Sequence, residues 1–435
     1  MRVFMLGWEF PPFISGGLGT ACYGLTKAMS ALGTDVLFLL PRPVARYDDA
    51  HLSLVGPAGV VETTIAETPI RLNDLERVTI RTVHANLNPY GTAVEYAERM
   101  ETQNVARDLA QSASTKPAAP VTTPIYGGDL FAEVQRYATL ALEVAETEAF
   151  DVVHAHDWMT CPAAMAVAAQ HGKPLVVHVH STEFDRSGAH VDQRIYDIER
   201  RGVHAAMRVI AVSHLTKNLL VKHYGVDADK IDVVYNAVDS ASVSPFVPEK
   251  YQINDSDKLV LFLGRITQQK GPEYFLEAAK KVLDVMQNVK FVMAGSGDMI
   301  RSAIEQAANL GIGHRVLFTG FLRGADVERV YRMADLYVMP SVSEPFGIAP
   351  LEAIANDVPV LISKQSGVSE VLPNALKVDF WDTNEMANKI VAVLRHPPLA
   401  RTLREEGSLD VQRLSWADST QACVSIYEQA ITAWR

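Results

Sequence analysis

Short runs of aliphatic and β-branched residues alternate with longer segments of helical periodicity along almost the whole chain. Each run is apolar nearly throughout, so the strand that it predicts is buried on both faces. Parallel strands covered on both sides by their connecting helices have this pattern. The sequence therefore predicts an α/β protein with doubly wound parallel sheets. The runs expected as strands are Arg2–Trp8, Asp35–Pro41, Arg77–Val83, Asp151–His156, Pro174–His180, Arg208–Ser213, Ile231–Val238, Lys258–Ile266, Val289–Gly297, Val316–Phe321, Leu336–Ser341 and Pro359–Lys364.

The alternation is interrupted at Asp239–Asp257, a segment rich in Ser, Pro and Asp that indicates an interdomain linker. A chain of 435 residues is long enough for two or three domains. We expect one Rossmann-like domain over residues 1–240 and a second over residues 241–413. A helical pattern over residues 414–435 has no strand after it, so we expect this helix to pack back on the first domain. Residues 46–125 are irregular and predict a surface excursion.

The composition narrows the choice of partners. A formal net charge of −11 favours solubility and argues against nucleic acid or an anionic membrane as the main partner. Cys22, Cys161 and Cys423 lie far apart and are odd in number, which indicates free thiols in a reducing compartment. The first apolar run is too short for a secretory signal, and no window approaches the roughly 20 apolar residues of a membrane span. We therefore expect a cytoplasmic protein without a membrane span.

Ligands of open α/β sheets bind beyond the carboxyl ends of the strands, so the residues after each run are candidates for a site. The first run is followed by Gly16, Gly17 and Gly19, and a helix is expected from about Thr20. Glycines at this point let backbone N–H groups approach an anion. The loop matches neither a Walker A loop nor a G-x-G-x-x-G fingerprint, so a plain strand-to-helix turn remains the alternative.

Histidines gather after two other runs. His156 ends one run and is expected at its exposed end, while His178 and His180 share one face of the next. A zinc site is the rival interpretation, but cysteine ligands and an HExxH motif are both missing from these stretches, so we expect no metal. The Asp227-x-Asp229 pair precedes a strand, where surface turns are normally polar, and it predicts a turn.

In the second half, Arg265 and Lys270 lie five residues apart across a turn after a strand. An arginine fork and a lysine point charge suit a diphosphate, although a solvated pair of cations is the alternative. Gly295 belongs to an Ala-Gly-Ser-Gly turn that matches only part of a dinucleotide fingerprint.

The stretch Ser341–Ala353, "SVSEPFGIAPLEA", combines two acids with a helix start. Free N–H groups at Phe346–Ile348 would favour a negative ligand, whereas Glu344 and Glu352 would repel it unless they bind hydroxyl groups. A sugar diphosphate offers both kinds of group. A capped helix with two solvated acids is the alternative.

Taken in order and at their spacings, these segments resemble the retaining glycosyltransferases of family 4. The resemblance is strongest to glycogen synthases, with starch synthases and sucrose synthase as wider relatives, and it covers nearly the whole chain. The motifs are "EFPPFISGGLG", "HAHDW", "HSTEFDR", "GRITQQKG", "AGSGD", "SEPFGIAPLEA" and "SKQSGVSEVL". One departure is Ile14, which stands where the glycogen synthase signature has a lysine.

The resemblance implies a GT-B fold, in which two Rossmann-like domains face each other across a cleft. It implies no metal and no cofactor other than a nucleotide diphosphate sugar as co-substrate. Arg265 and Lys270 would bind the diphosphate, Glu352 the ribose and Glu344 the sugar hydroxyls, with His156 beside the sugar. The implied donor-binding residues are Gly16, Gly17, Arg265, Lys270, Gly295, Phe346, Gly347, Ile348 and Glu352. Asp129 and Glu183 are suggested on the acceptor side.

These expectations lead to a retaining transfer of a hexosyl group, most simply glucosyl, from a nucleotide sugar to a carbohydrate hydroxyl. The alternatives are a nucleotide-sugar 2-epimerase of the same fold, a family 4 enzyme acting on a small acceptor, a nicotinamide dehydrogenase and a non-catalytic binding subunit. The sequence does not choose among ADP, UDP and GDP donors, and it leaves the acceptor and the oligomeric state open.

Overall fold

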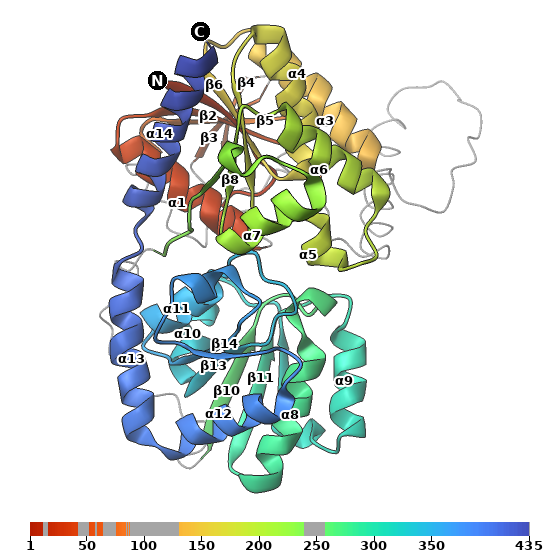
Figure 1. The fold of residues 1–435 in the computed structure, drawn as a ribbon, viewed down its shortest axis with the longest axis vertical. Helices are drawn as coiled ribbons and strands as arrows, with labels where there is room; N and C mark the ends of the chain where they lie inside the picture. Colours follow the sequence, from red (N-terminus) through yellow and green to blue (C-terminus); the bar gives the residue numbers. More distant parts are fainter. Residues whose placement is uncertain are drawn as a thin grey trace, which may run out of the picture.

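The structure is a computed structural model of the chain. It describes residues 1–11, 16–41, 52–56, 59–63, 75–83, 85, 87, 130–238 and 257–434. These residues form two sheets with covering helices, one above the other along the long axis (Figure 1). We call them the N-terminal and C-terminal domains. The predicted doubly wound α/β architecture is confirmed, whereas the boundary near residue 240 stays a prediction because residues 239–256 lie outside the described ranges.

The N-terminal sheet has nine strands in the order β4-β3-β5-β2-β1-β6-β7-β8-β9. The strands from β5 to β9 are parallel, and β3 and β4 form an antiparallel hairpin beyond β5. This hairpin is a correction, because it falls in residues 46–125, which were expected to be irregular. Its strands extend the open edge that β5 would otherwise present. The strands are β1 (Arg2–Leu6), β2 (Asp35–Leu40), β3 (Leu52–Gly56), β4 (Gly59–Thr63), β5 (Val78–Thr82), β6 (Val152–His156), β7 (Leu175–Val179), β8 (Arg208–Ala211) and β9 (Ile231–Val233).

Helices cover both faces of this sheet. In Figure 1, α1 and α14 lie on one side of the strands, and α3, α4 and α6 lie on the other. The apolar strand residues are therefore buried from both directions, as the continuous apolar runs require. The helices are α1 (Gly17–Ala31), α3 (Leu130–Ala145), α4 (Cys161–His171), α5 (Glu183–Ser187), α6 (Gln193–Ala205), α7 (His214–Leu219) and α14 (Trp416–Trp434).

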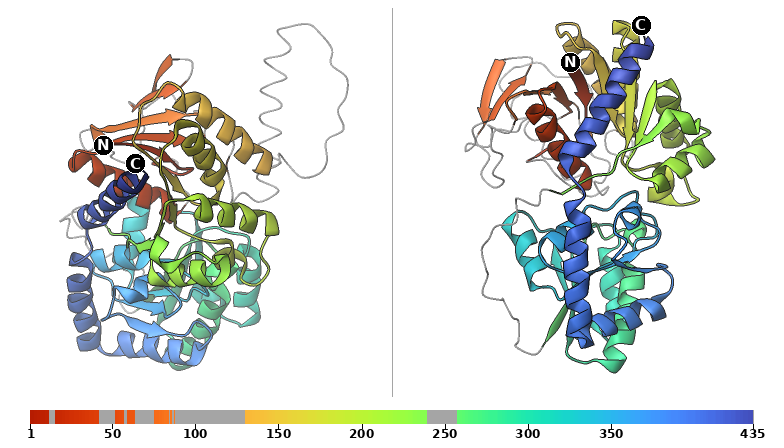
Figure 2. Two further views of the ribbon diagram at one scale, coloured as in Figure 1. Left: turned by 45° about the horizontal axis from the view of Figure 1, so that its top comes forward. Right: turned by 60° about the vertical axis from the view of Figure 1, so that its left-hand side comes forward.

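The C-terminal helix α14 returns to the N-terminal domain and packs on α1. Thr420 Oγ1 donates a hydrogen bond to the carbonyl of Leu25 at 3.3 Å. Gly24 of α1 faces Trp416, and any Cβ at this position would overlap the indole ring, so glycine permits the close approach. The right-hand view of Figure 2 shows α13 (Pro397–Gln412) and α14 as a path from the lower domain to the upper one.

The C-terminal sheet has six parallel strands in the order β12-β11-β10-β13-β14-β15. Its last strand, β15, is an addition to the expected set, because a run of three residues is too short to show a pattern. The strands are β10 (Lys258–Leu263), β11 (Val289–Ala294), β12 (Val316–Gly320), β13 (Leu336–Met339), β14 (Val360–Ser363) and β15 (Leu376–Val378). The remaining helices are α8 (Pro272–Val285), α9 (Ile300–Asn309), α10 (Ala325–Met333), α11 (Ala349–Ala355) and α12 (Thr383–Arg395).

The two domains meet at the carboxyl ends of strands from both sheets. Ser213, just after β8, donates to the carbonyl of Pro345, in the loop after β13, at 2.6 Å. Ser343 of the same loop donates to Asp185 of α5 at 2.6 Å. The carboxylate of Glu370 accepts the first free N–H groups of α7 at 2.8 and 2.9 Å. The strand ends at which ligands of such sheets bind therefore face one another.

The three cysteines are free thiols, as the sequence predicts. Cys22, Cys161 and Cys423 are buried free thiols, and burial raises the pKa of each. Such thiols are inert core residues rather than nucleophiles.

In the described ranges, every helix is too short or too polar to cross a lipid bilayer.

Candidate functional site

The loop between β13 and α11 is held against the neighbouring strand end by backbone hydrogen bonds. The carbonyl of Glu344 accepts from Gly367 N at 2.8 Å, and the carbonyl of Phe346 accepts from Val368 N at 2.8 Å. Gly347 has φ 101°, a conformation that favours glycine. This loop, residues 341–348, is therefore a defined turn and not a mobile connection.

The turn leaves a row of backbone donors unused. Within the described part of the chain, the N–H groups of Phe346, Gly347 and Ile348 donate no hydrogen bond. Pro350 lies in the first turn of α11, as expected, where its missing N–H costs nothing. Consecutive unpaired N–H groups need an acceptor, and an anionic oxygen is the strongest that a ligand supplies. The expected unpaired N–H groups of Phe346–Ile348 are thus found, and their contact with a ligand stays a prediction.

Lys270 and Glu344 are 74 residues apart in the chain and form an ion pair. The Glu344 side chain is 8% exposed and the Lys270 side chain 21%. Ser341 Oγ also donates to Glu344 Oε2 at 3.2 Å. Gly271 makes this pairing possible, because a Cβ there would overlap the carbonyl oxygen of Pro340. The loop after β10 can therefore lie directly on the end of β13, with Lys270 beside the turn.

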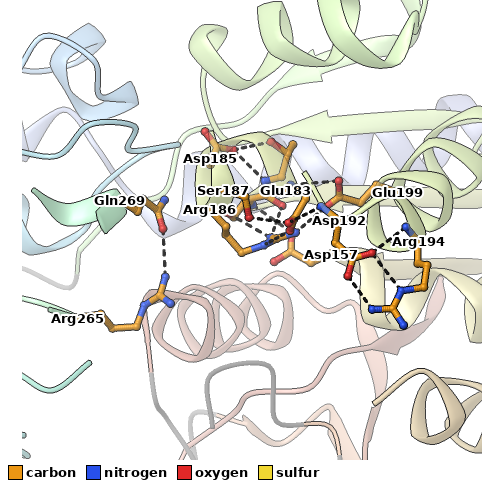
Figure 3. A network of polar contacts seen from close by, with 12 residues as sticks. Asp157, Glu183, Asp185, Arg186, Ser187, Asp192, Arg194, Glu199, Arg265 and Gln269 are labelled. Carbon is orange, nitrogen blue, oxygen red and sulfur yellow. Dashed lines mark hydrogen bonds and ion pairs between the residues drawn. The ribbon is translucent and has the colours of Figure 1, made fainter. Parts of the chain in front are cut away.

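Arg265 lies on the same edge of the C-terminal sheet. Its Nη2 donates to Gln269 Oε1 at 3.3 Å, and Gln269 in turn accepts from Val342 N through its carbonyl at 2.9 Å. Figure 3 shows the Arg265–Gln269 pair on one side and a polar network of the N-terminal domain on the other. Arg265, Lys270 and the unpaired N–H groups of Phe346–Ile348 therefore all follow the carboxyl ends of neighbouring strands, β10 and β13.

Gly295 is required for a reason internal to the fold. It has φ 142°, and a Cβ there would overlap the carbonyl of Gly264 at the end of β10. The glycine lets the ends of β10 and β11 approach each other. Its contact with a nucleotide sugar stays a prediction.

Glu352 lies in the first turn of α11, and its Oε2 accepts the hydroxyl of Tyr331 at 3.0 Å. Burial raises the pKa of the Glu352 carboxyl above its usual range. Among the described residues this is the one hydrogen bond to the Glu352 carboxylate, so acceptor capacity remains for a hydroxyl group. Its contact with a ribose stays a prediction.

The N-terminal glycine loop is already occupied by an acid. Helix α1 begins at Gly17, three residues before the expected start, and Gly19 N donates to Glu9 Oε2 at 3.2 Å. The expectation that this helix start is open to an anion needs correction, because the buried carboxylate of Glu9 already bonds there. Gly17 lies beside Ile348, to whose Cδ1 an added Cβ would approach within 4.0 Å. Gly17 thus borders the turn from the opposite domain, whereas the atoms nearest to Gly16 belong to Glu9. The contact of Gly16 and Gly17 with a donor stays a prediction.

His156 is buried, so the expectation that it is exposed is wrong. The reason is tertiary, since α14 covers this face of β6. Its Nδ1 is hydrogen-bonded to His180 Nε2 at 2.9 Å. His180 follows β7 and is half-buried, so it is the more exposed histidine of this pair. The role of His156 beside a sugar stays a prediction.

Asp157 was not predicted as a site residue. It has φ 60°, which is strained for a residue with a side chain. Its Oδ1 accepts from the backbone N–H groups of His180 at 2.7 Å and of Ser181 at 3.2 Å. Burial raises the pKa of its carboxyl to about 7. Backbone strain and a raised carboxyl pKa at a strand end are features of functional sites. In the sequence, the position of Asp157 directly after a predicted strand could have identified it as a candidate.

The two residues suggested for the acceptor have different outcomes. Glu183 is buried, and its carboxylate accepts from Arg186, Ser187 and the backbone of Asp192 at 2.6–3.1 Å (Figure 3). These donors account for its burial, and an acceptor contact stays a prediction. Asp129 lies outside the described residues.

The Asp-x-Asp pair forms a turn. The side chain of Asp227 accepts from Asp229 N at 3.0 Å and caps a short 3₁₀ helix at residues 228–230. This matches the expected surface turn at the amino end of β9.

Two family models match adjoining parts of the chain. "Glycosyltransferase Family 4" matches residues 95–242, and "Glycosyl transferases group 1" matches residues 243–410. The chain belongs to these glycosyltransferases. The recognition made from the motifs is therefore confirmed, and the two models meet within the segment expected as a linker.

Relatives and solved structures agree with this family. An uncharacterised glycosyltransferase of Methanocaldococcus jannaschii is 27% identical over 99% of both chains. A glycogen synthase of Mycobacterium tuberculosis is 27% identical over 98% of this chain and 94% of its own. Sucrose-phosphate synthase of Thermosynechococcus elongatus aligns over 100% of both chains with a TM-score of 0.73 and 19% identity. The Anabaena protein HepE, solved with UDP and glucose, has a TM-score of 0.66 and 17% identity over 98% of this chain and 99% of its own. The glycosyltransferase has the GT-B fold of these neighbours.

Proposed function

We propose that this glycosyltransferase transfers a glucosyl group from a nucleoside diphosphate glucose to a carbohydrate hydroxyl, with retention of configuration. One observation carries the proposal: the Lys270–Glu344 ion pair stands beside the unpaired N–H groups of Phe346–Ile348 at the strand ends. Cations and amides suit a diphosphate, and a carboxylate suits hydroxyl groups. A nucleotide sugar carries both in one molecule.

The Lys270–Glu344 ion pair explains how a carboxylate and a diphosphate can lie close together in this site. An isolated Glu344 carboxylate would repel a diphosphate, but Lys270 offsets its charge and holds it in one place. The diphosphate would accept from the amides of the turn and from Lys270 and Arg265. Glu344 would accept from hydroxyls of the sugar, and Glu352 from the ribose.

The same donors would stabilise departure of the leaving group. Negative charge grows on the diphosphate as the bond to the anomeric carbon breaks, and preorganised donors stabilise that charge most strongly in the transition state. With attack on the face that the diphosphate leaves, the diphosphate oxygen would take the proton of the acceptor hydroxyl. Retention follows without a covalent intermediate.

Two relatives support the choice of substrates. The HepE structure contains UDP and glucose, so UDP-glucose is the first donor to test. The mycobacterial relative is a glycogen synthase, so an α-glucan is the first acceptor. Ile14, in place of the lysine of the bacterial signature, makes ADP-glucose the second donor to test rather than the first.

The test has two stages. Thermal shift with ADP-, UDP- and GDP-glucose identifies the donor, since a ligand at 100 times its Kd stabilises the native state by about 2.7 kcal/mol. The stabilising donor is then incubated with glycogen, with maltose and without acceptor. Glucan elongation supports the proposal, and transfer to maltose alone indicates a small-molecule acceptor. A changed sugar without acceptor indicates an epimerase, and donor binding with no turnover indicates a binding subunit; either result refutes the proposal.

A further inference from the structure

A group of histidines is buried in the N-terminal sheet, under α14. Residues two apart on a strand share a face, so His154 and His156 of β6 point the same way. His178 of β7 pairs directly with His156 in the parallel register. All three imidazoles are almost completely shielded from solvent, at 0%, 0% and 2% exposure.

These imidazoles lie against one another with several ring nitrogens unused. The ring centroids of His154 and His156 are 4.3 Å apart, and His178 lies 5.4 Å from each. In the described residues, His154 Nε2, His156 Nε2 and both nitrogens of His178 have no hydrogen-bond partner. Buried polar atoms without partners are rare and unfavourable, so several at one point call for an explanation. The simplest explanation is one binding partner that is shared by the ring nitrogens of all three histidines.

The opposite nitrogens of the two β6 histidines are engaged. His154 Nδ1 is hydrogen-bonded to the hydroxyl of Tyr427 on α14. His156 Nδ1 is hydrogen-bonded to His180 Nε2 at 2.9 Å. Histidines that bind a metal use one ring nitrogen and hold the other in such a hydrogen bond, which fixes the ring. Both β6 histidines have this arrangement, with Nε2 left over.

We propose that His154, His156 and His178 bind one divalent transition-metal ion of the Zn²⁺ type. One ligand nitrogen from each lies within 4.8 Å of the others. Zn–N bonds of about 2.0–2.1 Å place tetrahedral ligands roughly 3.4 Å apart, so the nitrogens that are 4.8 Å apart or less need to approach one another by up to roughly 1.4 Å. An all-imidazole set suits Zn²⁺, Cu²⁺ or Ni²⁺ and does not suit Mg²⁺ or Ca²⁺.

The ion would link β6 and β7 to α14 through Tyr427. It would therefore stabilise the N-terminal domain. As a ligand of this ion, His156 would not contact the sugar, so this inference replaces the role predicted for His156 in the transfer. Burial lowers the pKa of all three imidazoles and keeps them in the neutral form that a metal requires. The inference stands whether or not the proposed glucosyl transfer is correct.

The first experiment measures the metal content of the wild-type chain. The protein is expressed with added Zn²⁺, its affinity tag is removed, and it is dialysed into metal-free buffer before elemental analysis. About one zinc ion per chain is expected. Refolding with Co²⁺ in place of Zn²⁺ should give the visible absorption of a cobalt centre with nitrogen ligands. Less than about a tenth of an ion per chain, with no cobalt spectrum, overturns the proposal even if every variant misfolds.

Variants then assign the ligands. His178→Gln should lower the metal content at least about tenfold. His190→Gln makes the same change at an exposed histidine outside the group and should leave it unaltered. Tyr427→Phe keeps the ring and removes the hydroxyl that holds His154, so it should weaken metal affinity by about 10–100-fold. Full metal content in folded His178→Gln refutes the assignment.

Discussion

Replacing Lys270 by methionine tests the site most directly, because it removes the charge and keeps most of the side-chain volume. Lys270 forms an ion pair with Glu344 beside the free amides of the turn. One preorganised donor at a developing charge contributes about 2.7–4 kcal/mol to catalysis, or about 10²–10³ in kcat. We therefore expect Lys270→Met to reduce kcat by about 10²–10³, with a smaller change in KM for the acceptor.

The same substitution also affects stability, and the two effects have to be separated. Removing one partner of a buried ion pair costs about 3–5 kcal/mol, but the Lys270 side chain is 21% exposed and water replaces part of the interaction. We expect a loss of about 1–3 kcal/mol in the free energy of unfolding. In Lys270→Met/Glu344→Gln the unpaired carboxylate is gone, so most of this stability should return while kcat stays low.

The assay is the initial rate of transfer at saturating donor, with thermal unfolding measured on the same samples. Lys280→Met is the matched control, because Lys280 forms an exposed ion pair with Asp284 within α8 and should change stability by less than about 1 kcal/mol. A folded Lys270→Met variant with near-wild-type kcat refutes the account of leaving-group stabilisation. Recovery of kcat in the double variant also refutes it, because the pair would then be structural.

Three further substitutions test the elements around the site. Gly271 has φ 65°, and Gly271→Ala places a Cβ against the carbonyl of Pro340. Thermal unfolding should therefore show a loss of about 1–3 kcal/mol in the free energy of unfolding, and transfer rates should fall because Lys270 shifts. Ser213→Ala removes the donor to Pro345 between the domains, and should cost about 1–3 kcal/mol by denaturant unfolding. Glu352→Gln should raise KM for the donor about tenfold with little loss of kcat, measured by steady-state kinetics. Because burial raises the pKa of the folded carboxyl above its ordinary value of 4.5, deprotonation opposes folding. Wild-type stability should therefore fall relative to Glu352→Gln as pH rises above 4.5 and through the raised pKa.

Each of these has an outcome that contradicts it. Wild-type melting of Gly271→Ala would show that the loop does not depend on the close approach to β13. Unchanged unfolding of Ser213→Ala, compared with Ser425→Ala on α14, would show that the domain contact contributes little. A pH-independent gap between wild-type and Glu352→Gln would show that this carboxyl is not desolvated.

Local patterns were sufficient to predict most strands and the motifs at their ends. Twelve runs were expected as strands, and each contains a strand of the structure, because an apolar run depends only on residues next to one another in the chain. Proline and glycine signals also placed Pro350 in the first turn of α11 correctly. The hairpin β3–β4 and the short β15 were missed, since pairing partners and not periodicity define them.

Tertiary structure decided which of the candidate groups are available to a ligand. His156 looked exposed at a strand end, but α14 arrives from the far end of the chain and buries it. The Glu9 carboxylate accepts the N–H of Gly19 at the start of α1, a contact that the glycine pattern alone does not reveal. Lys270 and Glu344 pair only because the order of the sheet puts β10 next to β13. Burial and charge pairing depend on contacts between distant segments, so the sequence alone determined the architecture and the chemical classes of its side chains, while the packing determined which side chains are free to act.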